Sequence, residues 1–145
     1  MKRLVALAAI VLATVLAPAA MSRASADRST LTAHSSRFGQ ILFDGKGFVL
    51  YAFTKDPRGR SACYGACAAA WPPYLVRSAP RAGAGVRSKL LGTTRRRDGK
   101  LQVTYAGRPL YYYAGDRSPN EIRCQNVDEF GGLWLVARPN GTLAR

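Results

Sequence analysis

Several short segments of this chain show the alternation of apolar and polar residues that is typical of β-strands. In the segment 101–105, three large apolar residues are separated by Gln102 and Thr104. Because successive side chains of a strand point to opposite faces, this pattern predicts a half-buried strand. The segment 131–136 also predicts a strand, which ends at the turn residues 139–141.

A first hairpin is predicted where two β-forming runs flank a turn. The runs are 40–43 and 48–53, and Asp44-Gly45-Lys46-Gly47 lies between them. Asp and Gly tolerate the positive φ values that tight hairpin turns need. The run 48–53 is apolar at both odd and even positions, so we expect a strand that is buried on both sides.

A second hairpin is predicted from the strand at 101–105, a turn at 106–109 and a return strand at 110–113. Each hairpin is followed by a loop that closes on a tryptophan, Trp71 in the first unit and Trp134 in the second. One segment, 61–71, favours helix because it is rich in alanine, and Pro72 must end it.

The two units carry the same motif, G-x-x-L-Y-x-[FY]-x-x-D. It spans 47–56 and again 107–116, sixty residues later, and both copies match at every specified position. In a structural interpretation the motif aromatics pack a core between duplicated hairpins, and the two aspartates accept hydrogen bonds from loop amides. In a functional interpretation the hydroxyls and carboxylates share a groove that binds a polar ligand. The candidate binding residues are Tyr51, Phe53, Asp56, Tyr111, Tyr113 and Asp116.

These patterns predict one small, mostly β domain, 38–140, in which two tandem hairpin-based repeats pack together, with a short helix near 63–71. Repeat one covers about 38–76 and repeat two about 101–139, and 141–145 is a tail. The intervening 77–100 is rich in Arg, Gly, Ala and Ser. We interpret it as a basic connector, either exposed or forming a long loop that carries a short strand.

The first 26 residues have the order of features that is typical of a secretory signal. Lys2 and Arg3 precede an apolar run at 4–17, and Ala24-Ser25-Ala26 fits a signal-peptidase site. The run is shorter than the roughly 20 residues of a membrane span. We therefore expect cleavage after Ala26, no transmembrane segment afterwards, and a secreted or periplasmic product. Residues 27–37 lack periodicity and predict a flexible leader.

The chain is strongly basic, with 22 Lys and Arg against 8 Asp and Glu and a net charge of +14. Removal of 1–26 takes away three basic residues and no acidic one, which leaves +11. Such a protein is attracted to anionic envelope polymers or acidic lipid headgroups. The alternative is that the charge serves only as a solubilising surface, since charge alone names no partner. Nucleic-acid surfaces interleave aromatic with basic residues. The stretch 77–100 contains no aromatic residue, so with export we expect no nucleic-acid partner.

Three cysteines, Cys63, Cys67 and Cys124, predict one disulfide and one remaining thiol in an oxidising compartment. A Cys63–Cys67 link contributes about 2 kcal/mol and a link from either one to Cys124 about 4 kcal/mol on the chain-entropy model. The sequence leaves the pairing open. It also leaves open redox-active thiols, although redox pairs are usually spaced C-x-x-C, and a soft-metal site that lacks a fourth ligand.

Catalysis has no support in the sequence. The single histidine, His34, lies in the predicted leader, so no Ser-His-Asp or Cys-His arrangement is available. There is no glycine-rich phosphate loop. We therefore predict a protein that is not an enzyme, with no metal and no cofactor.

The segments 50–56 and 61–73 resemble the bacterial secreted repeat of unknown function, whose members are also described as predicted lipoproteins with a Y-x-[FWY]-x-x-D motif. The segments 110–116 and 130–134 are similar to the family's second repeat. The resemblance covers about 37–140 and implies an exported envelope protein built from tandem repeats. It supplies no catalytic residues. Many relatives carry a lipobox cysteine and this chain does not, so lipid anchoring is not implied.

The prediction from the sequence is thus an exported bacterial cell-envelope protein that acts as a non-catalytic binding or structural module. Cys124 lies outside the motif that defines the repeat. The alternative is an extracytoplasmic thiol-redox or electron-transfer accessory protein, or a soft-metal carrier, that uses the three cysteines.

Overall fold

The computed structural model describes residues 30–145, so the predicted signal peptide lies outside the described residues. The fold is mostly β, as predicted. The strands are β1 (Thr30–Ser36), β2 (Gly39–Asp44), β3 (Tyr51–Phe53), β4 (Leu75–Val76), β5 (Arg81–Ala82), β6 (Leu91–Arg95), β7 (Leu101–Tyr105), β8 (Arg108–Pro109), β9 (Val127–Glu129) and β10 (Gly132–Val136). The helices are α1 (Ala66–Ala70) and a short 3-10 turn, η1 (Ser88–Leu90).

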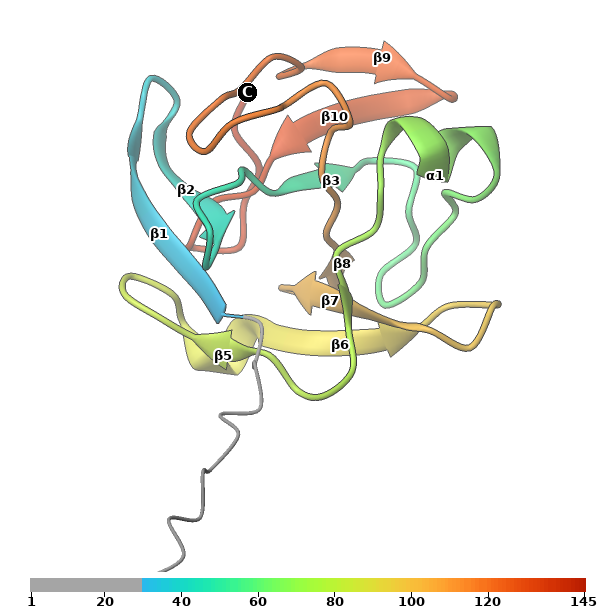
Figure 1. The fold of residues 1–145 in the computed structure, drawn as a ribbon, viewed down its shortest axis with the longest axis horizontal. Coiled ribbons are helices and arrows are strands. Elements are labelled where there is room, and N and C mark those ends of the chain that lie inside the picture. Colours follow the sequence, from blue (N-terminus) through green and yellow to red (C-terminus); the bar gives the residue numbers. More distant parts are fainter. Residues whose placement is uncertain (1–29) are drawn as a thin grey trace, which may run out of the picture.

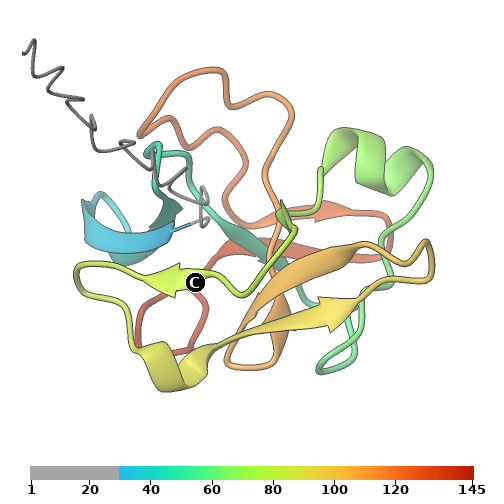
Figure 2. The same cartoon turned by 60° about the horizontal axis from the view of Figure 1, so that its bottom comes forward.

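The strands form three small sheets, with the orders β2-β1-β5, β3-β10-β9 and β4-β7-β6, and β8 pairs with β7. Figure 1 shows these sheets around a centre that β3 and β8 occupy. Helix α1 lies on the side of the molecule away from β1 and β2, which Figure 2 shows from a second direction. Among the described residues, no helix is long and apolar enough to cross a membrane.

The two repeats complete each other's sheets. Strand β10 of repeat two pairs with β3 of repeat one, and β4 of repeat one pairs with β7 of repeat two. At the centre Tyr51 and Tyr111 bridge reciprocally, each donating its backbone N–H to the other's carbonyl at 2.9 Å. This exchange is nearly two-fold symmetric. It confirms the prediction of two repeats packed into one domain.

Within the predicted strand 48–53, residues 49–53 are buried as expected, but Phe48 is half-buried and the strand β3 covers only Tyr51–Phe53. Val49, Tyr51 and Phe53 belong to one buried cluster with both tryptophans, and Leu50 belongs to a second with residues of β1, β2 and β7. Because alternate residues of the strand enter different clusters, this short segment joins the two halves of the core.

The structure corrects the predicted flexible leader over 30–36. These residues form β1, which pairs with β2 along six positions, and Leu31 is fully buried. The main partner of β2 is therefore β1. The run 48–53 adds a short hairpin pairing to β2 at the bridge Phe43–Val49, where Asp44 donates its N–H to Phe48 and Leu50 donates its N–H to Leu42. The inward side chains of β1 include small ones such as Ala33, so its amphipathic pattern is weak in the sequence.

Three further boundaries differ from the sequence prediction. The basic connector 77–100 contains β5, η1 and β6, and β6 pairs with β7 along five positions. The helix is shorter than 61–71 because Gly65, at φ 57°, lies outside the helical conformation just before it. The tail 141–145 is docked: Leu143 bridges to Ala137 and Ala144 is fully buried.

The second predicted hairpin is only partly formed. Strand β7 has the predicted bounds, but its direct return partner is the two-residue β8. The residues expected to continue that strand instead turn toward repeat one, where Tyr111 forms bridges to both Tyr51 and Pro73. The residues after β8 therefore pair with repeat one and do not extend the local hairpin with β7.

Candidate functional site

The tyrosines and aspartates of the two motifs are paired across the repeats. The Tyr51 hydroxyl of repeat one donates to Oδ2 of Asp116 in repeat two at 2.7 Å. The Tyr111 hydroxyl of repeat two donates to Oδ2 of Asp56 in repeat one at 2.6 Å. Each repeat thus supplies the phenol for one bond and the carboxylate for the other.

The second oxygen of each carboxylate fixes a loop. Oδ1 of Asp56 accepts the Ala62 N–H at 2.7 Å, and Oδ1 of Asp116 accepts the Arg123 N–H at 2.9 Å. The loop-amide bonds expected for these aspartates are confirmed. Since Ala62 precedes Cys63 and Arg123 precedes Cys124, the near two-fold symmetry also relates the two cysteine-bearing loops.

The motif aromatics pack around the two tryptophans. Phe53 stacks on Trp134 with ring centroids 4.2 Å apart, and Trp134 stacks on Trp71 at 4.0 Å. Tyr113 contacts the other side of this stack through Trp71 at 4.8 Å. Tyr51 meets Trp71 edge-on at 5.2 Å, and its counterpart in repeat two meets Trp134 in the same way at 5.1 Å.

Burial governs the protonation of these groups. It raises the pKa of the Tyr51 and Tyr111 phenols, and the neighbouring aspartates raise it further. It also raises the pKa of the Asp56 and Asp116 carboxyls, against the hydrogen bonds that they accept. Tyr51, Phe53 and Tyr111 are at most 2 % exposed, so these three side chains line no open groove.

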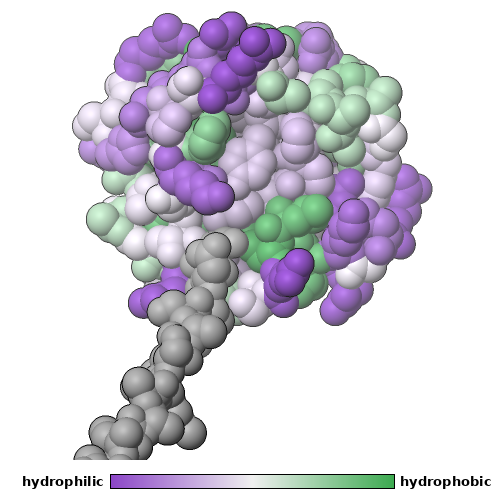
Figure 3. Space-filling model, viewed as in Figure 1, coloured by the Kyte–Doolittle hydropathy of each residue, from purple (hydrophilic) through white to green (hydrophobic). Residues whose placement is uncertain are grey.

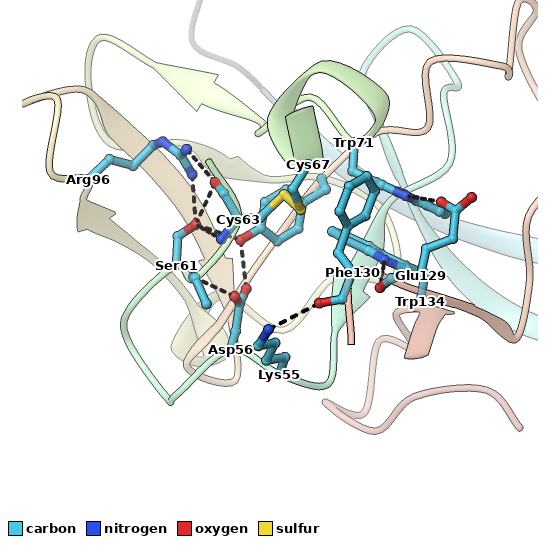
Figure 4. Close-up of a disulfide and its surroundings, with 12 residues drawn as sticks. Lys55, Asp56, Ser61, Cys63, Cys67, Trp71, Arg96, Glu129, Phe130 and Trp134 are labelled. Atoms are coloured by element: carbon cyan, nitrogen blue, oxygen red, sulfur yellow. Dashed lines mark hydrogen bonds between the residues drawn. A yellow bond between two sulfur atoms is a disulfide. The ribbon is translucent and has the colours of Figure 1, made fainter. Parts of the chain in front are cut away.

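A buried arginine that the sequence did not single out supports the same network. Arg96, only 4 % exposed, donates to Ser61 Oγ at 2.8 Å, to Gln102 Oε1 at 2.7 Å and to the Cys63 carbonyl at 2.7 Å. The Ser61 and Tyr111 hydroxyls are hydrogen-bonded to each other at 2.8 Å. Figure 4 shows Arg96 reaching over Ser61 toward the disulfide. In the sequence, this residue is one of three consecutive arginines, and nothing distinguishes it.

The structure decides the disulfide in favour of the short link. Cys63 and Cys67 are bonded, with Cα atoms 5.3 Å apart, and Cys124 is free and half-buried. The neighbouring Cys124 side chain is the main cause that raises the pKa of the Tyr113 hydroxyl. Within 30–145, no group of three or more His, Cys, Asp or Glu residues could hold a metal ion.

A groove lies on the face of the molecule shown in Figure 3. It consists of two adjoining depressions of about 710 and 360 Å³ that share Asp44, Lys46, Pro72 and Tyr112. Tyr74, Pro73 and Leu75 extend the larger depression, and Phe48, Tyr113 and Asp116 extend the smaller one. We call the combined feature the tyrosine–proline groove. In Figure 3 the centre of this face is only weakly coloured, and strongly hydrophilic side chains stand around it.

The polar groups on the floor of this groove are already bonded within the protein. Oδ1 of Asp44 accepts the N–H groups of Lys46 and Phe48 at 2.9 Å, and Oδ2 accepts the Tyr112 hydroxyl at 3.1 Å. Burial, followed by the charge of Asp44, raises the pKa of Tyr112. The rings of Tyr74 and Tyr112 lie 5.3 Å apart. The groove is therefore lined by the half-buried Tyr112, by the largely buried Tyr74 and by the exposed side chain of Lys46.

A second surface feature is a cluster of exposed cations that we call the basic ridge. It consists of Arg58, Arg60, Arg95, Arg97 and Lys100. The loop bearing the first two is fixed to β6 and to the β7–β8 turn. The Gly59 carbonyl accepts the Thr94 hydroxyl, and the Gly59 N–H donates to the Gly107 carbonyl. Figure 3 shows strongly hydrophilic side chains at the edge where Figure 1 places the turn between β6 and β7.

Comparison with known proteins agrees with this architecture. A family model described as a secreted repeat of unknown function matches residues 33–74 and 92–138, more than half of the 145 residues. The chain therefore belongs to this family of secreted repeats. The second match begins within β6, so the end of the predicted connector is part of repeat two. No curated protein and no solved structure matches the chain.

Proposed function

We propose that this secreted protein is a non-catalytic binding module of the cell envelope that holds anionic polymers on its exposed cations. The observation that carries the proposal is the separation of charge between interior and surface. Among the basic residues of 30–145, only Arg96, Arg108 and Arg138 are not exposed. The acidic residues are fewer, and most of them are bonded inside the molecule.

The internal use of acidic groups leaves the surface more basic than the composition alone indicates. Asp44, Asp56 and Asp116 bind tyrosine hydroxyls. Glu121 accepts the N–H groups of Arg117 and Ser118, and Glu129 accepts the Trp71 indole N–H. Salt bridges within the described residues join only Arg96 to Asp98 and Arg123 to Glu121. The exposed cations are otherwise available to a partner.

The basic ridge is also partly preorganised. The Arg95 guanidinium donates to the Gly99 carbonyl at 2.7 Å, and Arg58 donates to the Ala106 carbonyl at 2.5 Å. Arg97 lies over the Tyr64 ring at 4.0 Å. Side chains that are ordered before binding lose less conformational entropy when a polymer is bound. This ridge is therefore the most favourable place on the described surface for a polyanion.

The alternatives that use the three cysteines have less support. Cys63 and Cys67 are joined in a buried disulfide, and Cys124 is a separate thiol in the other repeat. The described residues contain no place where all three sulfurs meet. Thiol-redox and soft-metal functions therefore rest on the sequence alone.

The proposal is tested by retention of the mature protein on immobilised polygalacturonate and polyphosphate, with uncharged dextran as the control. We expect retention on both anionic polymers but not on dextran. The protein should elute as NaCl rises from about 0.05 to about 0.5 M, because salt screens exposed charges and reduces the free energy gained when counterions are released from the polymer. Retention that does not depend on salt, or no retention, would contradict the proposal.

A matched pair of variants tests the location of binding. Neutralising the ridge in the triple variant R95Q/R97Q/K100Q should lower the eluting salt concentration clearly. The triple variant R87Q/K89Q/R145Q removes the same charge from exposed positions outside the ridge and should elute close to the wild type. Equal shifts for both variants would show that net charge, rather than the ridge, determines binding.

A further inference from the structure

We propose that the tyrosine–proline groove binds an extended segment of a partner polypeptide that carries a lysine or arginine side chain. The segment adds a strand to β4 beside the larger depression, and its cation lies against Asp44 and Asp116. This inference goes beyond the proposed function, because it describes a second site whose charge is opposite to that of the basic ridge.

Strand β4 has one unpaired edge, and this edge borders the groove. β4 is the outer strand of the sheet β4-β7-β6, and within the described residues it pairs only with β7. The Tyr74 carbonyl accepts the Val103 N–H at 2.9 Å, so the next pair, Leu75 and Gln102, has no hydrogen bonds between its members. The backbone N–H and carbonyl of Leu75 therefore point away from β7. Leu75 lines the larger depression and is 38 % exposed. Such an edge is a template to which a second polypeptide can add a strand.

The charged side chains of the groove lining favour a cation. Asp44, Asp116 and Lys46 are the charged residues that line the two depressions, so two carboxylates stand against one ammonium. Arg77 and Arg117 are exposed and close in sequence to lining residues, but they line neither depression. The lining is therefore negative on a molecule whose surface is otherwise basic, and it attracts a positively charged group.

Both carboxylates can accept further hydrogen bonds. A carboxylate offers about four acceptor sites. Asp116 accepts one bond from the Tyr51 hydroxyl and one from the Arg123 N–H. Asp44 accepts three, from two backbone N–H groups and one hydroxyl. All of these donors are neutral, so the negative charges remain. An ammonium or guanidinium group supplies the missing positive charge together with additional donors.

The two depressions suit different parts of such a ligand. Their volumes of about 710 and 360 Å³ fall within the range of roughly 300–1,000 Å³ that ligand pockets occupy. The half-buried rings of Phe48, Tyr112 and Tyr113 line the smaller depression together with Asp116. Aromatic rings attract cations and pack against the alkyl stem of a lysine or arginine. We therefore place the backbone of the ligand along β4 in the larger depression and its cationic side chain in the smaller one.

The experiment titrates the mature protein with a blocked six-residue peptide that alternates threonine and valine and carries one central lysine. Binding is followed by the anisotropy of a labelled peptide and by the amide chemical shifts of the protein. At about 0.15 M salt the Debye length of about 8 Å screens the distant basic ridge. We expect saturable binding with shifts at Leu75, Lys46 and Tyr112. The same peptide with glutamate in place of lysine should cause none of these shifts, and equal binding of both peptides in the groove would overturn the proposal.

Lys46 tests the sign of the charge that the groove selects. Because its ammonium repels the cation of the ligand, Lys46→Gln should bind the lysine peptide about two- to fivefold more tightly. Lys89→Gln removes the same charge from an exposed position outside the groove and should change the affinity by less than about 1.5-fold. Both substitutions are at exposed positions, so both variants should fold. Unchanged or weaker binding by Lys46→Gln would overturn the proposal.

Leu75 tests the addition of a strand. Leu75→Pro removes the N–H that points toward the ligand, at an edge position where proline is tolerated. It should weaken binding about fivefold or more. Leu75→Thr keeps the N–H and should bind within about twofold of the wild type. Thermal unfolding checks that both variants are folded, and equal affinities of the two folded variants would contradict strand addition.

A last comparison needs no variant of the protein. Two peptides are methylated on alternate backbone nitrogens, one in each of the two possible registers. Only the register that pairs with Leu75 should lose affinity, by about fivefold or more. Equal affinities of the two methylated peptides would overturn the proposal. Dimerisation of the protein without peptide, with shifts at the same residues, would assign the groove to a second copy of the chain and would also overturn it.

Discussion

At the scale of single residues, the tyrosines of the repeated motif act as buried hydrogen-bond donors. The Tyr51 and Tyr111 hydroxyls donate hydrogen bonds to carboxylates of the opposite repeat, and both side chains are shielded from solvent. A tyrosinate in either place would lie next to a carboxylate without a donor between them. The fold therefore depends on both phenols remaining protonated.

This dependence predicts loss of stability in alkali. The pKa of both phenols is raised in the folded state, while the unfolded value is about 10. Above pH 10 the unfolded chain releases protons that the folded chain keeps. The free energy of unfolding is therefore intact below pH 10 and should fall above it by about 1.4 kcal/mol per pH unit for each phenol. Urea unfolding between pH 9 and 12, followed with tyrosinate absorbance, measures the slope.

The control is Tyr111→Phe, which should lower the slope by one proton. If Tyr51 and Tyr111 ionise in the folded protein near pH 10, the account of the core bonds is wrong.

Arg96 yields a second prediction at this scale. Arg96→Met leaves Ser61, Gln102 and the Cys63 carbonyl without their donor, and we expect a loss of about 3 kcal/mol in the free energy of unfolding. Arg96→Lys should recover little, because an ammonium cannot reproduce the planar fork of a guanidinium. Lys100→Met, at an exposed position nearby, should change stability by less than about 0.5 kcal/mol. Equal effects at both positions would contradict the role of Arg96.

At the scale of elements, the disulfide closes a short loop that leads into α1. With a sequence separation of 4, it restricts few unfolded conformations. The variant C63S/C67S should fold with the same β-sheet spectrum and lose about 2 kcal/mol. Cys124→Ser, which removes the free thiol, should leave stability within about 0.5 kcal/mol. Urea titrations with and without reductant measure these differences in the free energy of unfolding. If the double variant were completely unfolded, the disulfide would be needed for the whole fold and not only for the local loop.

The sequence predicted the elements with strong patterns and missed those with weak ones. The clear alternation at 101–105 corresponds to β7, and the apolar segment at 131–136 corresponds to β10. Strand β1 was missed because several of its residues are Ser, Thr and small Ala. A short strand within 77–100 was one of two interpretations of that stretch, but β6 could not be located because Gly92 and two threonines interrupt its apolar pattern. The predicted helix was too long because the helix propensity of alanine gives no information about the backbone conformation of Gly65.

The candidate site was only partly predictable, because the sequence shows the repeated motif but not the contacts between the repeats. The motif aromatics and aspartates were recognisable as a repeated set, and the structural interpretation anticipated their packing and their loop-amide bonds. Their exchange between repeats was not visible, because each copy contains its own Tyr and Asp. The tyrosine–proline groove left no signal, because Lys46, Pro72 and Tyr112 come from three separate segments.

At the scale of the whole molecule, we assign stability to the motif residues of the interior and polymer binding to the exposed basic residues. Reciprocal strand pairing and reciprocal Tyr–Asp bonds make the repeats one domain. Hydrogen bonds within the protein hold Asp44, Asp56 and Asp116 in the interior, whereas most of the basic side chains are exposed. A substitution in the motif should therefore change stability without changing polymer binding, and a substitution in the ridge should do the reverse.

The most direct test measures both properties on two variants at a temperature where both are folded. For Tyr111→Phe we predict a free energy of unfolding that is lower by about 1–3 kcal/mol and an affinity for polygalacturonate equal to that of the wild type. For R95Q/R97Q/K100Q we predict unchanged stability, within about 0.5 kcal/mol, and a clear loss of affinity and of its salt dependence. A folded Tyr111→Phe variant that loses binding, or a ridge variant that keeps it, would contradict the assignment of the motif to the core and of binding to the surface.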